Sequence, residues 1–166
     1  NEATDDGNFL LTKEEKEEII HLYPEAQKYI KQATGAYEFI NSIFQWCIWL
    51  DKKNNKNAYA VLPIKERIDK IEKFRLSSKK IATRKFAETP FRFTGVRHKD
   101  SDSIIMPSTS SERREYIPIG FLDKDTITKN SAYVIYDAEP YLFGIITSKM
   151  HMIWVKTVAG RLKSDY

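Results

Sequence analysis

Apolar and polar residues near the N-terminus recur with the period of short helices. Thr12 is followed three residues later by Glu15, the pattern of a capping box, in which the two side chains bond free backbone N–H groups at a helix start. Pro24 interrupts the pattern, because proline suits the first turn of a helix and not its interior. Gly35 is typical of a helix end. The pattern predicts two short helices between residues 12 and 35.

A dense apolar run follows, "EFINSIFQWCIWLD", and ends at the turn-like "DKKNNKN". Its second half is rich in aromatic and β-branched residues, which favours a strand. Pro63 then opens a stretch in which apolar residues recur at helical spacing, with basic residues on the other face. This stretch predicts one long helix that closes at Thr89 and Pro90. Its apolar positions are Ile64, Ile68, Ile71, Phe74, Ile81 and Phe86.

Beyond Pro90 the pattern changes to short strands separated by turns: "SIIMP", "EYIPIGFL" and "AYVIYDA". Pro107 and Pro118 inside these runs predict edge positions or irregular pairing. Pro140 starts a last helical pattern, for which Gly160 is a natural stop. The whole pattern predicts an α+β (mixed) fold, with N-terminal helices and a long basic helix, then short strands packed with a C-terminal helix.

Positive charge is concentrated in one part of the chain. The net charge is +4, but Lys65 to Lys99 holds twelve Lys and Arg against four acidic residues, so this segment carries +8 and the remainder −4. Such a segment favours a polyanion partner. A solvated, lysine-rich helix face explains the same charges, and the sequence alone leaves both interpretations open.

Composition narrows the class of protein. With 166 residues and 42% apolar content, the chain can bury one core. Cys47 lies among tryptophans and Ile48, which predicts a buried thiol in a reducing compartment. No run is long and apolar enough to span a bilayer, and the first residues are acidic and polar, unlike a secretion leader. We therefore expect a cytoplasmic protein without a membrane partner.

The residue types do not form the pattern of an active site. The six glycines are far apart, so no phosphate-binding glycine-rich loop is present, and the three histidines lack metal-ligand spacing with one another or with Cys47. No proline follows an asparagine, which excludes the Asn-Pro-Pro-aromatic motif of base-flipping amino-methyltransferases. The acids of "DKDTITK" are a weak nuclease candidate and more typical of a turn. We expect no catalytic residue, cofactor or metal in this chain.

Three polar loops follow or precede apolar elements: "PSTSSERREYIP", "TKNSAY" and "GRLKSDY". Asparagine can bond adenine with two hydrogen bonds, lysine or arginine can donate to guanine, and aspartate can accept from cytosine. Arginine and serine also suit phosphate contacts, which position a protein on DNA. Each loop taken singly also fits an ordinary capped turn. Three such loops beside a basic segment favour DNA recognition.

Five stretches between residues 28 and 166 match a known family in order and spacing: "YIKQATGAYEFINSIFQWCIWL", "RIDKIEKFRLSSKKIATRKFAETPFRF", "SSERREYIPIGFL", "NSAYVIYDAEPYLFGIITSKMHMIWV" and "AGRLKSDY". Over these residues the chain resembles the MmeI-like type II (IIG/IIL) restriction-modification enzymes, large proteins with DNA-adenine methyltransferase activity. The resemblance implies that residues 1–62 are the C-terminal end of the methyltransferase core or a connecting segment, and that residues 63–166 are a target recognition domain truncated at its C-terminal end.

The resemblance also implies partners and cofactors. The partners are double-stranded DNA, read in the major groove, and the remainder of the same polypeptide in a bacterial cell. S-adenosylmethionine and Mg²⁺ are expected only for the full-length parent, because the family's cofactor-binding and endonuclease motifs are not in this chain. Gln45 departs from the family, which has an arginine there, so no contact is inferred from it.

Individual roles follow from the matched motifs. A base-recognition role is implied for five residues: Ser108, Asn130, Ser131, Lys163 and Asp165. A role in contacting the DNA backbone is expected for seven residues: Lys79, Lys80, Ser110, Ser111, Arg113, Arg114 and Arg161. The two lysines are included because their segment is strongly basic.

The leading hypothesis is a sequence-specific DNA-recognition module that is non-catalytic in isolation. The alternative is a protein–protein docking or specificity module without direct DNA contact, for which the aromatic-rich surfaces would be the interface. Salt separates the two, because phosphate contacts weaken steeply with ionic strength and an apolar docking surface does not. A free-standing nuclease would require DNA cleavage by this chain in the presence of Mg²⁺.

Overall fold

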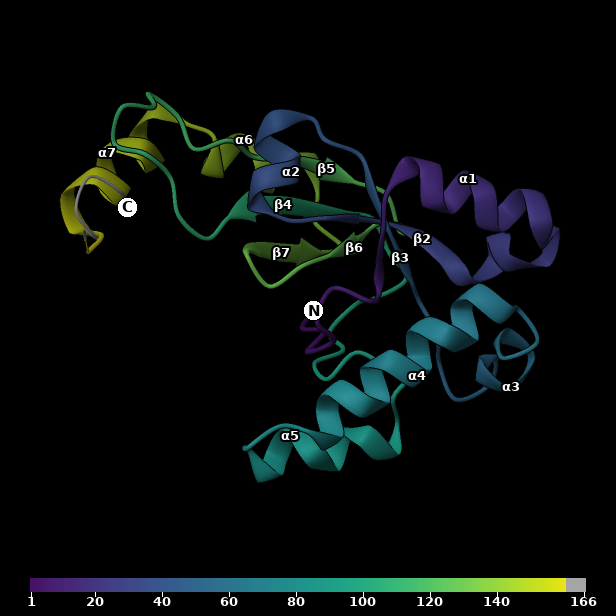
Figure 1. The fold of residues 1–166 in the computed structure, drawn as a ribbon. Helices are drawn as coiled ribbons and strands as arrows, with labels where there is room; N and C mark the ends of the chain where they lie inside the picture. Colours follow the sequence, from purple (N-terminus) through teal and green to yellow (C-terminus); the bar gives the residue numbers. More distant parts are fainter. Residues whose placement is uncertain (161–166) are drawn as a thin grey trace. The chain divides into compact units, whose positions relative to one another are not determined.

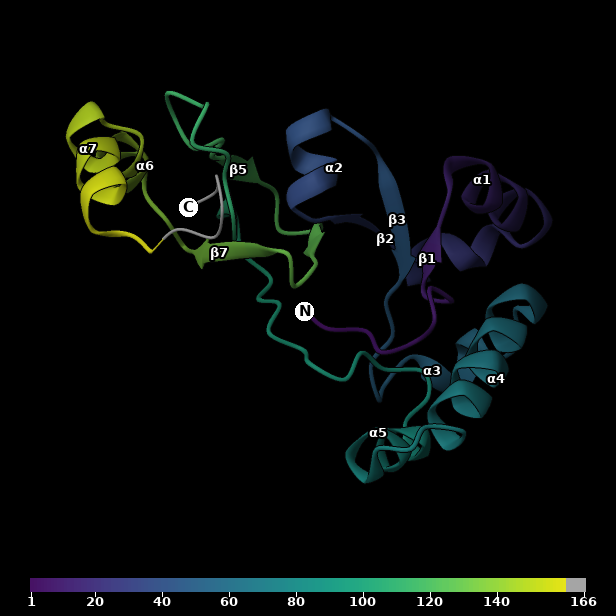
Figure 2. The same cartoon turned by 60° about the vertical axis from the view of Figure 1, so that its left-hand side comes forward.

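The computed structural model describes residues 1–160. The chain forms two compact units, the first made of Asn1–Ala33 and Phe44–His98 and the second of Thr34–Ile43 and the residues from Lys99 onward. Figures 1 and 2 show the elements of both units from two sides. A short loop-and-helix segment, residues 34–43, therefore belongs to the second unit although residues of the first unit precede and follow it.

The first unit combines short antiparallel strands with helices. Leu11 of the first strand lies opposite Trp46, and Ile30 of the second lies opposite Ile48. Cys47 is fully buried, which confirms the expected buried thiol, and the second half of the apolar run is a strand as predicted. The elements are β1 (Leu10–Leu11), α1 (Lys13–Leu22), η1 (Pro24–Tyr29), β2 (Ile30–Thr34), β3 (Gln45–Ile48), α3 (Asn55–Ala58), α4 (Leu62–Leu76), α5 (Ile81–Lys85) and η2 (Phe86–Glu88).

The predicted start of α1 is confirmed. The Thr12 hydroxyl accepts a hydrogen bond from Glu15 N at 3.2 Å, and Thr12 N donates to Glu15 Oε2 at 2.9 Å, so both halves of the capping box are made. The second predicted helix ends early, because residues 30–33 pair with β3, and residues 30–34 form a strand instead. Gly35 is consequently the N-cap of the next helix and does not terminate the previous one.

The long helix predicted from Pro63 is interrupted. Its first part, α4, buries Ile64, Ile68 and Ile71 at the expected spacing. The helix ends at Leu76, and four residues separate it from α5, which begins at Ile81. The Ser77 hydroxyl donates to the Phe74 carbonyl at 2.8 Å, so a serine side chain bonds the backbone where the helix stops. One continuous helix was therefore a wrong prediction, and its apolar face is buried only in part, because Phe74, Ile81 and Phe86 are exposed.

The second unit contains a three-stranded antiparallel sheet with β4 between β5 and β7. Ile104 and Ile105 of the central strand are fully buried. Pro107 ends this central strand beyond the residues that pair with β5 and lies opposite Ala132 of β7 only, which agrees with the predicted irregular pairing, whereas Pro118 precedes β5 and lies outside the strands. The elements are α2 (Ala36–Asn41), β4 (Ser103–Pro107), β5 (Gly120–Leu122), β6 (Ile127–Thr128), β7 (Ala132–Tyr136), α6 (Pro140–Ile146) and α7 (Lys149–Val158).

Helix α2 lies beside β4 and β5 (Figure 1). A Cβ on Gly120 would come within 2.8 Å of the Phe39 ring, so only glycine allows this close approach. The C-terminal helix starts at Pro140 as predicted but divides at Thr147, whose hydroxyl bonds the Phe143 carbonyl at 2.6 Å. Ser148 then caps α7 by accepting from His151 N at 3.2 Å.

The predicted fold class is confirmed, because helices are combined with short strands in two small sheets; β1 and β2 were not predicted among the N-terminal helices. The predicted boundary between residues 62 and 63 stays a prediction. No helix among residues 1–160 is long and apolar enough to cross a membrane.

Candidate nucleic-acid interface

A polar turn precedes β7 and carries two of the predicted base-reading residues, Asn130 and Ser131. The pairing of β4 with β7 places Pro107 opposite Ala132, which brings Ser108 next to the turn. Ser108 N and the Ser108 hydroxyl both donate to the Ser131 carbonyl, at 3.1 and 2.8 Å. The structure therefore brings together three predicted residues that are up to 23 positions apart in the sequence.

The start of α2 holds this turn from the other side. Lys129 N donates to the Thr34 carbonyl at 2.7 Å, and Ala36 N donates to the Ser131 hydroxyl at 3.0 Å. The Lys129 ammonium bonds Glu38 Oε1 at 2.6 Å, while Glu38 Oε2 accepts from Gly35 N at 3.0 Å. The residues on both sides of Asn130 are thus bound to one short segment.

Glu38 is ionised in this arrangement. Partial burial on its own would raise the pKa of the Glu38 carboxyl. The hydrogen bonds from Lys129 and from backbone N–H groups, together with the lysine charge, outweigh burial and hold the pKa below its usual value. The ion pair is therefore intact at neutral pH.

Asn130 is exposed, and its side chain makes no hydrogen bond to residues 1–160. Its amide offers one acceptor oxygen and two donor hydrogens, the set that pairs with the major-groove edge of adenine. The Ser131 hydroxyl is exposed as well and accepts from Ala36, so its own hydrogen can be donated to a partner. These groups have the chemistry of base recognition, and the assigned roles stay predictions.

Substitution of Gly35 by alanine is expected to displace the turn. The new Cβ would lie 2.4 Å from Ser131 Oγ, 2.9 Å from Lys129 Cε and 3.0 Å from Glu38 Oε2, so at least one of these contacts must give way. We expect a loss of about 1–2 kcal/mol in the free energy of unfolding, because a hydrogen bond that holds the turn is broken and its neighbours have to shift. Chemical denaturation measures this loss. Gly144→Ala is the control, because nothing lies within 4 Å of a Cβ there, and an equal loss in both variants would contradict the account.

The loop after β4 holds four residues expected to contact the DNA backbone. Arg113 is exposed, and its backbone N–H donates to the Ser111 hydroxyl at 3.3 Å. Arg114 N donates to the Ser111 carbonyl at 3.1 Å, so the loop is a compact turn. Ser110 is buried, and its hydroxyl has no hydrogen-bond partner among residues 1–160. A phosphate contact from Ser110 therefore requires the loop to open, whereas the Arg113 guanidinium is accessible as it stands.

The basic segment divides into structural and accessible residues. Arg75 is fully buried and Arg67 is partly buried; each donates to backbone carbonyls, and Arg67 also pairs with Glu15. Those two arginines are therefore unavailable to a polyanion, which corrects the picture of a uniformly exposed basic helix. Lys79 and Lys80 lie between α4 and α5, and both are exposed.

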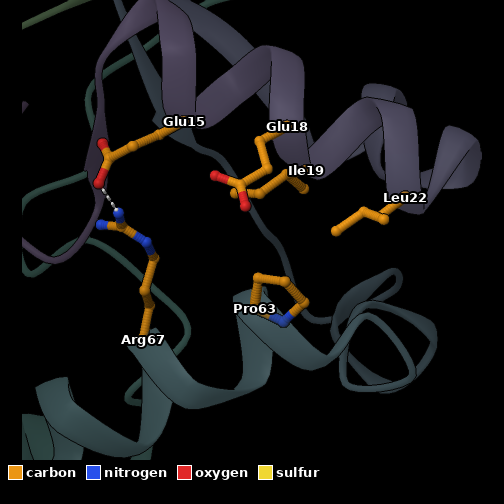
Figure 3. Close-up of a pocket in the computed structure, with 6 residues that line it drawn as sticks. All are labelled: Glu15, Glu18, Ile19, Leu22, Pro63 and Arg67. Carbon is orange, nitrogen blue, oxygen red and sulfur yellow. Dashed lines mark hydrogen bonds and ion pairs between the residues drawn. The ribbon is translucent and has the colours of Figure 1, made fainter.

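An open groove between α1 and α4 in the first unit is lined by Glu15, Glu18, Ile19, Leu22, Pro63 and Arg67 (Figure 3). The two glutamates and the apolar residues lie on α1, and Pro63 and Arg67 face them from α4. The Arg67 guanidinium already bonds Glu15 and the carbonyls of Asn8 and Leu10. The groove is therefore a structural contact between two helices.

Three predicted residues, Arg161, Lys163 and Asp165, lie outside the described residues, so their roles stay predictions. Sequence reasoning missed the residues that hold the turn, Gly35, Glu38 and Lys129. One signal was present: glutamate three residues after Gly35 is one half of a capping box. Within residues 1–160 no group of three or more His, Cys, Asp or Glu is placed to hold a metal ion.

Comparison with known proteins identifies the family. The family model described as "MmeI, target recognition domain" matches residues 1–166. DNA methyltransferase A of Bacillus subtilis (strain 168) is 45% identical over 166 residues, which are 100% of this chain and 19% of that protein. A solved structure of the type IIL restriction-modification enzyme MmeI in complex with DNA matches with a TM-score of 0.93 and 44% sequence identity. The match covers 100% of this chain and 22% of the MmeI chain. The chain therefore spans about a fifth of the length of these relatives and belongs to the MmeI target recognition domain family.

Proposed function

We propose that this chain binds double-stranded DNA and reads a specific base sequence in the major groove, as the recognition part of a larger DNA-methylating protein. The family supports this proposal, as does the likeness over the whole chain to an enzyme solved in complex with DNA. The observation that carries it is the turn at Asn130 and Ser131. Exposed amide and hydroxyl groups are held there by backbone and ion-pair contacts, and rigid placement is what selective hydrogen bonding to bases requires.

The residues divide by the chemistry of their partners. Bases are contacted by Ser108, Asn130 and Ser131, and further along the chain by Lys163 and Asp165. Phosphates are contacted by Lys79, Lys80, Ser110, Ser111, Arg113, Arg114 and Arg161. Phosphate contacts fix the register of a protein on DNA, and base contacts then select the sequence.

The full-length protein is proposed to methylate adenine with S-adenosylmethionine in the bacterial cytoplasm, with Mg²⁺ serving an endonuclease activity. Residues 1–160 do not fit either cofactor, because they contain no glycine-rich loop and no cluster of metal ligands. Both cofactors would therefore be held by other parts of the polypeptide, and this chain contributes recognition without a chemical step.

Selection from a library of DNA duplexes with a randomised central segment tests the proposal. The full-length protein should enrich one asymmetric sequence, and a duplex of that sequence should bind more tightly than a scrambled duplex of equal composition. Affinity for both duplexes should fall steeply with salt. Recovery of the random library without enrichment would exclude sequence reading. Binding that is insensitive to salt would instead favour a docking surface without phosphate contacts.

Removal of the two exposed lysines, Lys79 and Lys80, should weaken binding to every sequence alike. The logarithm of the binding constant falls with the logarithm of salt by about 0.9 per phosphate contact, so Lys79→Ala with Lys80→Ala should flatten this slope by about two units. Titrations at several salt concentrations measure it. The control is Lys52→Ala with Lys53→Ala, which removes the same charge from another exposed site of the first unit. Equal slopes for the two double variants would contradict the assigned phosphate contacts.

A further inference from the structure

We infer that Glu38 and Lys129 are positioning residues for sequence reading: their ion pair ties the turn that carries Asn130 and Ser131 to the start of α2. The inference rests on the proposed function and adds two residues to which no DNA contact is assigned. Both residues belong to the second unit, although they are 91 positions apart in the sequence.

The contacts are arranged on both sides of Asn130. On one side, Lys129 is bound through its backbone N–H to Thr34 and through its ammonium to Glu38. On the other side, the Ser131 hydroxyl accepts from Ala36 N and the Ser131 carbonyl accepts from Ser108. Asn130 itself projects as an exposed residue between two fixed neighbours. Any change that frees Lys129 therefore loosens one end of a very short segment whose middle residue is proposed to contact a base.

The Glu38 carboxylate accepts one hydrogen bond at each of its two oxygens, and a neutral amide cannot accept both. Oε1 accepts from the Lys129 ammonium and Oε2 accepts from Gly35 N. Glutamine has one acceptor oxygen and one amide nitrogen, and the nitrogen would face another donor. Glu38→Gln therefore loses either the contact to the turn or the contact to α2, while the size of the side chain is unchanged.

This pair differs from an ordinary surface ion pair. The side chains of Lys129 and Glu38 are 22% and 13% exposed, and the bond between them is 2.6 Å long. Lys13 and Glu17 form a pair at 3.9 Å with side chains 67% and 62% exposed. Solvent screens the second pair far more than the first. Glu17→Gln is therefore a matched control, with the same chemical change and the same change in charge.

The arrangement also orients the Ser131 hydroxyl. Because its oxygen accepts from Ala36 N, its hydrogen has to point away from that N–H group. A hydroxyl held in this way presents a donor in a defined direction. The segment from Gly35 to Glu38 thus controls the geometry of both proposed base-reading side chains without contacting DNA itself.

The test uses the full-length protein and two probes, the duplex enriched from the random library and its scrambled counterpart. The variants are Glu38→Gln, Lys129→Gln, Lys129→Arg and the control Glu17→Gln. For each we measure the ratio of the two affinities, and thermal unfolding reports whether the protein is folded. If the unmodified protein does not discriminate between the probes, the proposed function itself fails, which is a result separate from any outcome for the variants.

The expected result is a loss of selectivity without a loss of general binding. Glu38→Gln and Lys129→Gln should lower the affinity ratio by about tenfold, as expected when one base contact is misplaced, while the affinity for the scrambled duplex changes little. Lys129→Arg keeps a charged donor for Glu38 and should retain most of the selectivity. The control should behave like the unmodified protein.

Three results would overturn the inference. One is a ratio that stays unchanged in Glu38→Gln and Lys129→Gln. Another is an equal loss of affinity for both duplexes, which indicates a phosphate contact or a general structural role. The third is a failure of Lys129→Arg to restore selectivity in a folded protein, because the ion pair would then not be the feature that matters.

Discussion

Replacement of Arg75 by alanine is expected to lower the free energy of unfolding by roughly 3–5 kcal/mol, the largest effect among the substitutions considered. The side chain is fully buried in the first unit. Its guanidinium donates five hydrogen bonds of 2.9–3.0 Å, all to backbone carbonyls: those of Ala3, Thr4, Phe86, Thr89 and Arg92. Alanine leaves these carbonyls without their donor and opens a cavity.

The position of Arg75 explains why so much depends on it. The N-terminal segment has left-handed backbone at Thr4 and Asp6, with φ of 50° and 52°, a conformation that non-glycine residues rarely adopt. Arg75 binds this segment and the η2 region together at one point. Burial lowers the pKa of Arg75 and the nearby Asp5 carboxylate opposes that change, yet arginine keeps its charge in proteins. The strained N-terminal segment is therefore held in place by the charged side chain of Arg75, which donates five hydrogen bonds.

Chemical denaturation of Arg75→Ala, Arg75→Lys and Arg84→Ala measures the effect. Lysine keeps the charge but has only three donor hydrogens. The decrease in the free energy of unfolding of Arg75→Lys should therefore lie between the decreases of the other two variants. Arg84 is exposed and donates to the carbonyls of Ser78 and Lys79, so its removal should cost less than about 1 kcal/mol. Similar losses in Arg75→Ala and Arg84→Ala would contradict the structural role assigned to Arg75.

Substitution of Asn130 by alanine is expected to abolish discrimination at one base pair of the DNA site, a change of about 1–3 kcal/mol in selectivity. The fold should tolerate the change, because the side chain is exposed and makes no hydrogen bond to residues 1–160. Asn130→Ala should therefore change recognition without changing stability, whereas the expected effect of Arg75→Ala is on stability.

Repeating the library selection with Asn130→Ala measures this change. One position of the enriched sequence should become degenerate while the others are retained, and the unfolding midpoint should stay the same. Asn57→Ala is the control, because Asn57 is an exposed asparagine of the first unit to which no DNA contact is assigned. If Asn130→Ala enriched the same sequence as the unmodified protein, Asn130 would not take part in base recognition.

Features set by neighbouring residues were predictable from the sequence. The capping box at Thr12, the helix starts at Pro24 and Pro140, and the buried face of α4 all depend on residues within a few positions. The errors arose where a distant partner decided the outcome. Residues 30–34 form a strand because β3 lies beside them, and Gly35 then becomes a helix start instead of a helix end.

The candidate site was predictable only in part for the same reason. Asn130 and Ser131 were found from the hydrogen-bonding capacity of their side chains, which is a property of residue type. The contact between Glu38 and Lys129 joins positions 91 residues apart and leaves no local pattern. Residue type also does not distinguish the arginines of the basic segment from one another. Only the fold shows that Arg75 is buried whereas Arg84 is exposed.

We propose that this chain decides which DNA sequence the full-length protein reads. The most direct measurement replaces residues 1–166 in the full-length protein by the matching segment of a family member whose own enriched sequence differs, followed by selection from the same duplex library. We expect the chimaera to enrich the DNA sequence that is read by the family member from which the segment was taken. Enrichment of the recipient's original sequence would contradict it.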